Sequence, residues 1–336
     1  MTHILRRVTA LLLPVFLFSS GWTNAQDSSR FIATGKPLMT IYSNFHSEFS
    51  QGEAGRAGFA LTRVYLGYKY DFHPHFTAAV KLDIGSPDDI GISGIKRYAY
   101  FKNAYLEYHT ERFHWSFGLV STKMFKLSEK YWGHRYISKP FLDQYRFGPS
   151  ADLGMVISYR FLPTLTADFS LLNGEGYTRL QVDTAFKYAL GITWQPLKKW
   201  IIRGYGDVYH HAFSRSVLSL FSGYKSDHLT LGGEFSYYLN AGPEKMMDKW
   251  GASASLSWDL SDHLQYFGRL DYLNARIRDK NREEWSPTTP GTGLTTGIQY
   301  APVKHVKMAL TWRSWTPETA SRVPSGWILI NLEVHF

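Results

Sequence analysis

The last eleven residues of the chain, 326–336, read GWILINLEVHF, and apolar and polar positions alternate along most of them. A period of two is the pattern of a β-strand, in which successive side chains point to opposite faces. One such strand fits a soluble β-sandwich as well as a membrane barrel, so the recurrence of the pattern must decide between them. One face carries Ile328, Ile330, Leu332, Val334 and Phe336, and the other carries Trp327, Leu329, Asn331, Glu333 and His335.

The same alternation returns throughout the chain. It is present at 62–72 (TRVYLGYKYDF), 76–84 (FTAAVKLDI), 182–194 (VDTAFKYALGITW) and 306–313 (VKMALTWR). In each segment the charged residues occupy one face, and apolar and aromatic residues occupy the other. Segments of about ten residues with this pattern are typical of transmembrane β-barrels. We therefore predict an all-β, antiparallel transmembrane barrel.

The composition favours the same fold class. The 336 residues include 22 Tyr, 22 Phe and 11 Trp, yet the mean hydropathy is −0.26. A barrel accounts for both values, because aromatic rings gather at the two membrane interfaces while the lumen stays polar. The chain has no cysteine, which excludes a disulfide scaffold. No run after the N-terminus approaches the roughly 20 apolar residues that a membrane helix needs.

The first 25 residues have the pattern of a cleaved signal peptide. Arg6 and Arg7 precede an apolar run at 8–18, and TNA at 23–25 has the small residues of a cleavage site. The apolar run is too short for the alternative, a membrane helix. We therefore expect export and a single barrel domain over 26–336. Loss of the two arginines lowers the net charge from +9 to +7, and a basic exported protein favours anionic solutes or lipid head groups over nucleic acid.

Short and long connections alternate between the predicted strands. Counting hairpins predicts about 16 strands with short periplasmic turns, longer outer loops and both termini on the periplasmic side. The weakest strand, 216–223 (SVLSLFSG), is included because an odd number would put long loops on the wrong side. No linker or domain boundary supports a soluble sandwich. Short turns are predicted at 72–75, 110–112, 161–164, 195–199, 224–227, 259–262 and 301–305, and longer connections at 50–56, 85–96, 124–150, 173–180, 210–216, 240–248, 276–292 and 314–325.

The third long connection, 124–150, differs from the rest of the chain. From residue 126 it reads KLSEKYWGHRYISKPFLDQYRFGPS, which is aromatic, basic and unusually long for a structureless loop. We predict that it folds into the barrel and narrows the lumen; the alternative is a loop packed outward with solvated charges. About 16 strands enclose an aqueous channel, and rings of Lys or Arg select anions. The predicted anion-binding residues are Lys126, Lys130, Arg135, Lys139 and Arg146 in this loop, and Arg63, Lys81, Lys187, Arg203 and Arg313 on inward strand faces.

A family resemblance rests on segments spread over most of residues 59–240. They are FALTRVYLGYKYDF (59–72), KLDIGS (81–86), YAYFKNAYLEY (98–108), GLVSTKMFKLSEKYWGHRYISKPF (118–141), SADLG (150–154), LLNGEGY (171–177) and FSGYKSD (221–227). Together they resemble the phosphate-selective porin family (the O and P type), in the form found in Bacteroidetes-like outer membranes. Phe336 is also similar to the terminal aromatic residue of outer-membrane barrels. The resemblance implies an anion channel of about 16 strands that is usually trimeric.

These features predict an outer-membrane porin for the passive diffusion of small solutes, with a preference for anions, phosphate among them. The expected partners are outer-membrane lipid, small anionic solutes and further copies in a homotrimer, and we expect no cofactor, metal or nucleic acid. A structural or adhesive barrel is the alternative. A barrel hydrolase is a weaker one, in which His210, His211, Asp207, Ser214 and Ser216 would form the site. It is weaker because adjacent strand residues point to opposite faces, so the two histidines cannot share one site in an unbroken strand.

Overall fold

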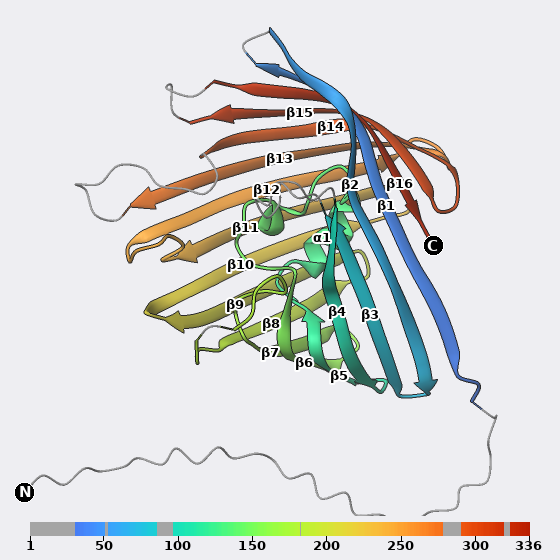
Figure 1. Ribbon diagram of the computed structural model, residues 1–336, viewed down its shortest axis with the longest axis vertical. Helices are drawn as coiled ribbons and strands as arrows, with labels where there is room; N and C mark the ends of the chain where they lie inside the picture. The colour runs from blue at the N-terminus through green and yellow to red at the C-terminus, as the bar shows by residue number, and fades with distance from the viewer. Residues whose placement is uncertain (1–30, 51–52, 86–96, 182, 278–289, 319–322) are drawn as a thin grey trace, which may run out of the picture. The chain divides into compact units, whose positions relative to one another are not determined.

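The computed structural model is a closed β-barrel. Sixteen antiparallel strands each pair with their neighbours along the chain, and β1 pairs with β16 (Figure 1). This confirms the predicted fold class and strand number. The barrel forms one compact unit, Ala33–Phe336, and the predicted signal peptide lies outside the described residues. Within those residues no helix is long and apolar enough to cross a membrane. The structure describes residues 31–50, 53–85, 97–181, 183–277, 290–318 and 323–336.

Two short helices, α1 (Lys126–Trp132) and α2 (Phe141–Gln144), interrupt the connection between β5 and β6. The strands are β1 (Thr34–Ser50), β2 (Glu53–His73), β3 (Phe76–Gly85), β4 (Tyr98–His109), β5 (Phe113–Ser121), β6 (Ala151–Leu162), β7 (Leu165–Leu172), β8 (Lys187–Leu197), β9 (Trp200–His211), β10 (Phe213–Lys225), β11 (Leu229–Leu239), β12 (Met247–Asp259), β13 (Leu264–Ile277), β14 (Gly291–Val303), β15 (Val306–Pro317) and β16 (Ser325–His335).

Along the strands the side chains alternate between the two faces of the barrel wall, as the sequence predicts. On β15 and β16, Leu310 and Ile330 are 60% and 55% exposed on the outside, whereas Thr311 and Asn331 are 1% and 0% exposed on the inside. The side-chain amide nitrogen of Asn331 donates a hydrogen bond of 2.9 Å to Oγ1 of Thr311, so these inner polar side chains are linked across the two strands. The outer face is an apolar belt, which is the surface that a bilayer requires of a barrel.

Among the described residues, the connections follow the predicted rhythm with two exceptions. The predicted long connections at 85–96 and 276–292 lie largely outside the described residues, and the one at 314–325 lies partly outside them. All seven predicted short turns join consecutive strands, and residues 216–223 lie within β10, so these predictions are confirmed. The predicted long connections at 50–56 and 210–216 are wrong, because only residues 51–52 separate β1 from β2 and only Ala212 separates β9 from β10. The β9–β10 ladder continues through polar residues that the sequence suggests as loop. Ala212 then reverses the chain in the left-handed conformation, with a φ of 52°.

The first residues of β1 and the last residues of β16 lie at the same mouth of the barrel. β1 and β16 pair in register from Thr40 opposite His335 to Ser50 opposite Ser325. Beyond this ladder, the backbones of Met39 and Phe336 exchange two hydrogen bonds of 3.0 Å. The seven short turns lie at the same mouth, which we call the short-turn end, and the opposite mouth is the long-loop end.

The outward position of Leu310 gives a direct test of the belt. Leu310→Arg is expected to destabilise the folded barrel in a bilayer by about 2–4 kcal/mol, because this is the cost of an arginine near the bilayer midplane. Refolding of urea-unfolded protein into lipid vesicles measures this. Asn44→Arg is the control, because Asn44 faces the lumen, and an equal loss in both variants would mean that the belt does not contact lipid.

Candidate functional site

The connection between β5 and β6, residues 122–150, folds into the barrel, and we call it the inner loop (Figure 1). Helix α1 ends at Gly133, whose φ of 68° is a left-handed cap that glycine adopts without steric cost. The aromatic side chains of the loop pack against the barrel wall rather than facing solvent, which confirms the predicted inward fold. The most buried of them are Phe147 (0% exposed), Phe125 (1%) and Phe141 (1%), followed by Trp132 (2%).

Two tyrosine hydroxyls fix the inner loop to the wall. The hydroxyl of Tyr136 donates a hydrogen bond of 2.9 Å to Oε1 of Gln299 on β14. The hydroxyl of Tyr145 donates one of 3.0 Å to Oδ2 of Asp271 on β13. Buried polar groups need such partners, and each bond is lost if the loop leaves the wall. The loop is therefore held in one position by directional bonds as well as by packing.

A buried lysine on β12 holds the end of α2. Lys249 is 1% exposed, and its ammonium donates hydrogen bonds to the backbone carbonyls of Tyr145 (2.6 Å) and Arg146 (3.1 Å). The same ammonium lies 4.7 Å from the centre of the Phe147 ring. A buried charge is costly unless it is hydrogen-bonded. Lys249 is therefore satisfied only while the inner loop is docked.

Glycines lie in the wall where loop aromatics come closest. A Cβ at Gly251 would lie 2.5 Å from the ring of Phe141, and one at Gly223 would lie 2.5 Å from the ring of Tyr131. Both distances are far below contact, so any larger residue at either position would push the ring away. The sequence gives the positions of these glycines, but only the fold shows which loop side chains, more than 80 positions away, pack against them.

His134 is a buried titratable group of the inner loop, 2% exposed. Its Nδ1 lies 2.6 Å from the carbonyl oxygen of Trp132, and its Nε2 lies 2.8 Å from Oε1 of Gln265. Burial lowers the pKa of His134 to about 4, although both hydrogen-bond partners favour the protonated ring. The docked loop therefore holds a neutral histidine at physiological pH.

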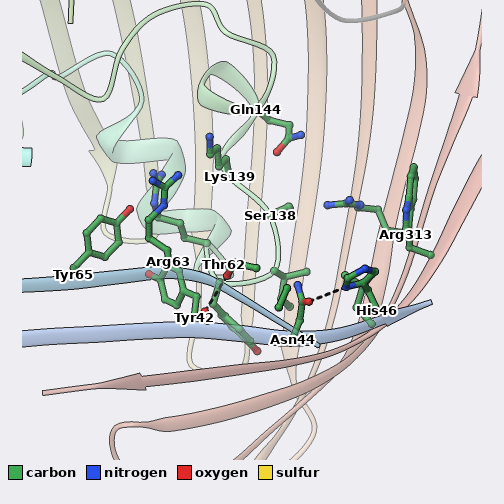
Figure 2. A pocket seen from close by; sticks show the side chains of 16 residues that line it. Tyr42, Asn44, His46, Thr62, Arg63, Tyr65, Ser138, Lys139, Gln144 and Arg313 are labelled. Atoms are coloured by element: carbon green, nitrogen blue, oxygen red, sulfur yellow. Dashed lines mark hydrogen bonds between the residues drawn. The ribbon is translucent and has the colours of Figure 1, made fainter. Parts of the chain in front are cut away.

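A cavity of about 390 Å³ lies between the inner loop and the wall formed by β1, β2, β15 and β16 (Figure 2). Its lining includes Tyr42, Asn44 and Gln144, which offer uncharged hydrogen-bonding groups. Among the lining residues that the structure describes, every permanently charged side chain is basic and none is Asp or Glu. These basic residues are Arg63 and Arg313 of the wall and Arg135 and Lys139 of the inner loop. Figure 2 shows Arg63, Lys139 and Arg313 around the cavity.

Two of these four cations are paired with carboxylates behind the cavity surface. Arg63 bonds Asp83 at 3.0 Å. Arg135 bridges Glu129 and Asp143 at 3.0 and 2.9 Å. These carboxylates offset much of the field of the two guanidinium groups.

The other two cations are less compensated. Lys139 and Arg313 have no carboxylate partner among the residues that the structure describes. The guanidinium of Arg313 lies 4.9 Å from the centre of the Trp327 ring, which keeps it extended along the wall. Lys139 and Arg313 therefore carry most of the positive field of the cavity. A neighbouring cavity of about 250 Å³ shares Ser138, Gln144, Arg313 and Trp327 with the first, so the space continues past Arg313.

Four of the ten predicted anion-binding residues therefore line one cavity, and two line another. Arg146 and Lys187 border a separate cavity of about 310 Å³ together with Arg179 and Arg215. Lys187 pairs there with Asp207 at 3.6 Å.

The remaining four predicted residues line none of these cavities. Lys126 pairs with Glu129 at 3.3 Å, and Lys130 is exposed on α1. Lys81 lies over the Tyr65 ring, 4.2 Å from its centre. Arg203 is buried against Asp168, with bonds of 2.6 and 3.0 Å. Several uncharged residues that line the cavity were not predicted from the sequence, because only permanently charged residues were considered as anion ligands. Alternation along β1 and β2 would have placed several of them inside the barrel. They are Tyr42, Asn44, His46, Tyr65, Gln144 and Trp327.

The residues of the hydrolase alternative do not form one site. Nδ1 of His210 lies 2.8 Å from Oγ of Ser214, its partner across the β9–β10 hairpin. His211 instead pairs with Asp183. Asp207 lies on the inner face, where it accepts hydrogen bonds from the hydroxyl of Tyr205 and the backbone of Val217. A serine and a histidine are therefore paired, but the carboxylate that would orient the histidine is engaged elsewhere.

The comparisons with known proteins identify a fold. No protein-family model matches the sequence, and no curated protein matches it. Among solved structures, the outer membrane channel DcaP of Acinetobacter baumannii is similar at a TM-score of 0.63 and 11% identity, over 90% of this chain and 97% of that one. OmpT of Vibrio cholerae is similar at 0.64 and 9% identity, over 90% and 98%. OmpF of Salmonella typhi, in complex with daunomycin, is similar at 0.64 and 7% identity, over 89% and 97%. The barrel architecture is shared with these outer-membrane proteins over nearly their whole length.

Removing the buried ammonium of β12 tests how the inner loop is held. In Lys249→Met the carbonyls of Tyr145 and Arg146 lose charge-assisted donors, and loop docking should weaken by about 1.5–3 kcal/mol. Hydrogen–deuterium exchange of residues 141–148 should rise accordingly. Lys245→Met, at an exposed lysine in the β11–β12 connection, is the control and should leave exchange unchanged. Unchanged exchange in Lys249→Met would show that packing alone holds the loop.

His134 predicts a pH dependence of the same docking equilibrium. The pKa is lowered from 6.5 to about 4 in the docked loop, so the undocked loop binds more protons between these pH values. Docking is therefore expected to weaken as the pH falls from 6.5 towards 4, by up to about 3 kcal/mol. His134→Gln removes the titrating group and should flatten this dependence, as followed by exchange of residues 126–148 at a series of pH values. Identical pH profiles in both proteins would assign the effect to other groups.

Proposed function

We propose that the protein is an outer-membrane porin, a water-filled channel for the passive diffusion of small solutes that prefers anions. The observation that carries the proposal is the cavity between the inner loop and the β1–β2–β15–β16 wall, because the charged side chains that line it in the described part of the chain are all cations. Support for the channel comes from the 16-strand barrel, because barrels of this size enclose an aqueous lumen. The outer apolar belt suits a bilayer, and the short turns would face the periplasm.

The anion preference follows from the charge balance of the lining. Carboxylates behind the cavity surface offset Arg63 and Arg135, while Lys139 of the loop and Arg313 of β15 have no such partner among the described residues. A narrow, water-filled space with low-dielectric walls strengthens the field of such charges and raises the local concentration of counter-ions. Rings of Lys and Arg are the usual selectivity element of anion pores.

The solutes of this channel would be small anions, and phosphate is one candidate because of the family resemblance. Both inorganic and carboxylate anions suit the lining, since guanidinium and ammonium groups donate to either, with Tyr42, Asn44 and Gln144 as additional polar groups. The homotrimer is part of the same proposal. It is supported by the resemblance and by the similar OmpT structure that is described as a trimer form.

Planar-bilayer recording tests the proposal. The wild-type protein is expected to pass chloride in preference to potassium, and phosphate should compete with the chloride current. Lys139→Glu with Arg313→Glu reverses both uncompensated charges and should lower the anion-to-cation permeability ratio by about thirtyfold, since each reversed charge contributes on the order of 1 kcal/mol in a water-filled space.

Lys130→Glu is the matched control, because Lys130 is exposed but does not line the cavity, and its selectivity should stay close to that of the wild type. Cation preference in the wild-type protein would refute the anion claim. A correctly folded barrel without any conductance would refute the channel itself.

A further inference from the structure

Two cavities beside the inner loop share four lining residues. The larger cavity, of about 390 Å³, lies against β1, β2, β15 and β16, and the smaller one, of about 250 Å³, extends to β13 and β14. Pockets for organic ligands usually have volumes of about 300–1,000 Å³, so the larger cavity alone offers more space than one inorganic ion needs. We call the four shared residues the junction. They are Ser138, Gln144, Arg313 and Trp327.

Three junction side chains have no hydrogen-bond partner among the residues that the structure describes. Oγ of Ser138 is buried without a partner, in a residue that is 6% exposed. The side-chain amide of Gln144 and the guanidinium of Arg313 likewise form no hydrogen bond or ion pair within the described chain. Figure 2 shows the side chains of Gln144 and Arg313 pointing toward one another. Polar groups that a protein leaves open in this way are satisfied by water or by a solute.

The backbone that carries the loop side of the junction is fixed by two hydrogen bonds. The indole N–H of Trp132 donates one of 2.9 Å to the carbonyl oxygen of Ser138. The guanidinium of Arg269 on β13 donates one of 2.8 Å to the carbonyl oxygen of Lys139. On the wall side, the contact with the tryptophan ring holds the guanidinium of Arg313. A solute that binds here therefore pays little to order the groups that it meets.

The charge at the junction suits a solute with one negative charge. Arg313 is the charged member of the junction, and the planar guanidinium presents parallel N–H donors that match the two oxygens of a carboxylate. Asp271 and Arg269 also line the smaller cavity, but they pair with each other at 2.9 Å and offset one another. Lys139 lines only the larger of the two cavities.

The uncharged groups of the junction suit hydroxyl groups. The amide of Gln144 and the hydroxyl of Ser138 can each donate and accept a hydrogen bond. An anion without hydroxyl groups can only accept, so it would leave the oxygens of these two side chains unpaired, whereas a hydroxyl group can pair with both functions. Sites with open polar groups discriminate against ligands that leave those groups unpaired. Trp327 and Trp315 line the same space and offer apolar surface to a carbon skeleton.

We propose that the junction binds hydroxylated monocarboxylates, the class of hydroxy acids and sugar acids, more tightly than carboxylates of the same size without hydroxyl groups. The carboxylate would accept from Arg313, and the hydroxyl groups would exchange hydrogen bonds with Gln144 and Ser138. This inference rests on the proposed anion channel, because the solute reaches the junction through the lumen, and it names the solute class of that channel.

Isothermal titration calorimetry of the purified full-length protein in neutral detergent tests the inference. Sodium gluconate and sodium hexanoate are the probes, because they have the same number of carbon atoms and one carboxylate each, and only gluconate carries hydroxyl groups. Micelles without protein give the blank for each probe. Gluconate is expected to bind at least about fivefold more tightly than hexanoate, the gain from one additional hydrogen bond. Equal affinities, or binding of neither probe, would overturn the proposal.

Variants assign the binding to the junction. Gln144→Met with Ser138→Ala removes the partners of the hydroxyl groups, and gluconate should then bind about as weakly as hexanoate. The two replaced side chains form no hydrogen bond within the described barrel, so the variant is expected to fold, which circular dichroism checks. Gln195→Met is the matched control, because Gln195 is exposed near the end of β8 and lines neither cavity, and it should keep the preference. A preference that persists in the double variant would overturn the proposal.

Arg313→Met gives a second, independent readout. Since both probes carry the carboxylate, their affinities should fall together, and an unchanged affinity for both would overturn the proposal. Calorimetry detects binding without current, so the outcomes for the channel and for its solute class can be told apart. Equal affinities alongside anion-selective currents would overturn this inference alone, whereas a gluconate preference in a folded barrel without conductance would refute only the proposed channel.

Discussion

The closure of the backbone hydrogen-bond ladder is the constraint on which this structure depends. A sheet of this size has two edges, and the pairing of β1 with β16 removes both. Once every strand is paired on both sides, the outer surface can be apolar without leaving unpaired amides in contact with hydrocarbon. The same closure creates an inside, and the period of two then assigns alternate residues to lipid and to lumen. The mild overall hydropathy and the high aromatic content are consequences of that division.

The lumen is too wide for the wall side chains to fill, and the inner loop occupies part of it. Its hydrophobic core is built from both partners, with Phe141, Leu142 and Phe147 of the loop packed among Val217 and Leu273 of the wall. Directional contacts then select one docked position, since Gln299 and Asp271 each accept a hydrogen bond from one loop tyrosine and Lys249 donates to two adjacent loop carbonyls. The space that remains beside β1, β2, β15 and β16 is lined by inward-facing wall residues on one side and by residues 135–139 and Gln144 of the loop on the other. The shape of the candidate channel is thus set by where the loop is anchored.

The charge pairs in the lumen show why the number of basic residues is a poor guide to the electrostatic potential there. Arg203 and Arg135 are inward-facing or loop cations, yet each is held by carboxylates at about 3 Å or less. Such pairs act as structural braces, because a nearby opposite charge cancels most of the long-range potential. In the sequence, Arg313 and Lys139 cannot be told apart from Arg203 and Arg135. They differ in the structure, because no carboxylate of the described residues pairs with them. The sign of the cavity lining rests on that difference.

The sequence by itself determined the barrel, the strand number, the seven short turns and the inward fold of the third loop. Each of these follows from local information: alternation along a strand, turn residues between strands, and a loop too long and aromatic to remain in solvent. The connections predicted at 50–56 and 210–216 are too long, because backbone pairing near a strand end continues regardless of side-chain polarity. Only the tertiary structure decided which cations share a cavity, which are neutralised, and that Gly223 and Gly251 admit the loop aromatics. Those facts depend on distances between residues far apart in the chain, and spacing along one strand carries no information about what lies across the lumen.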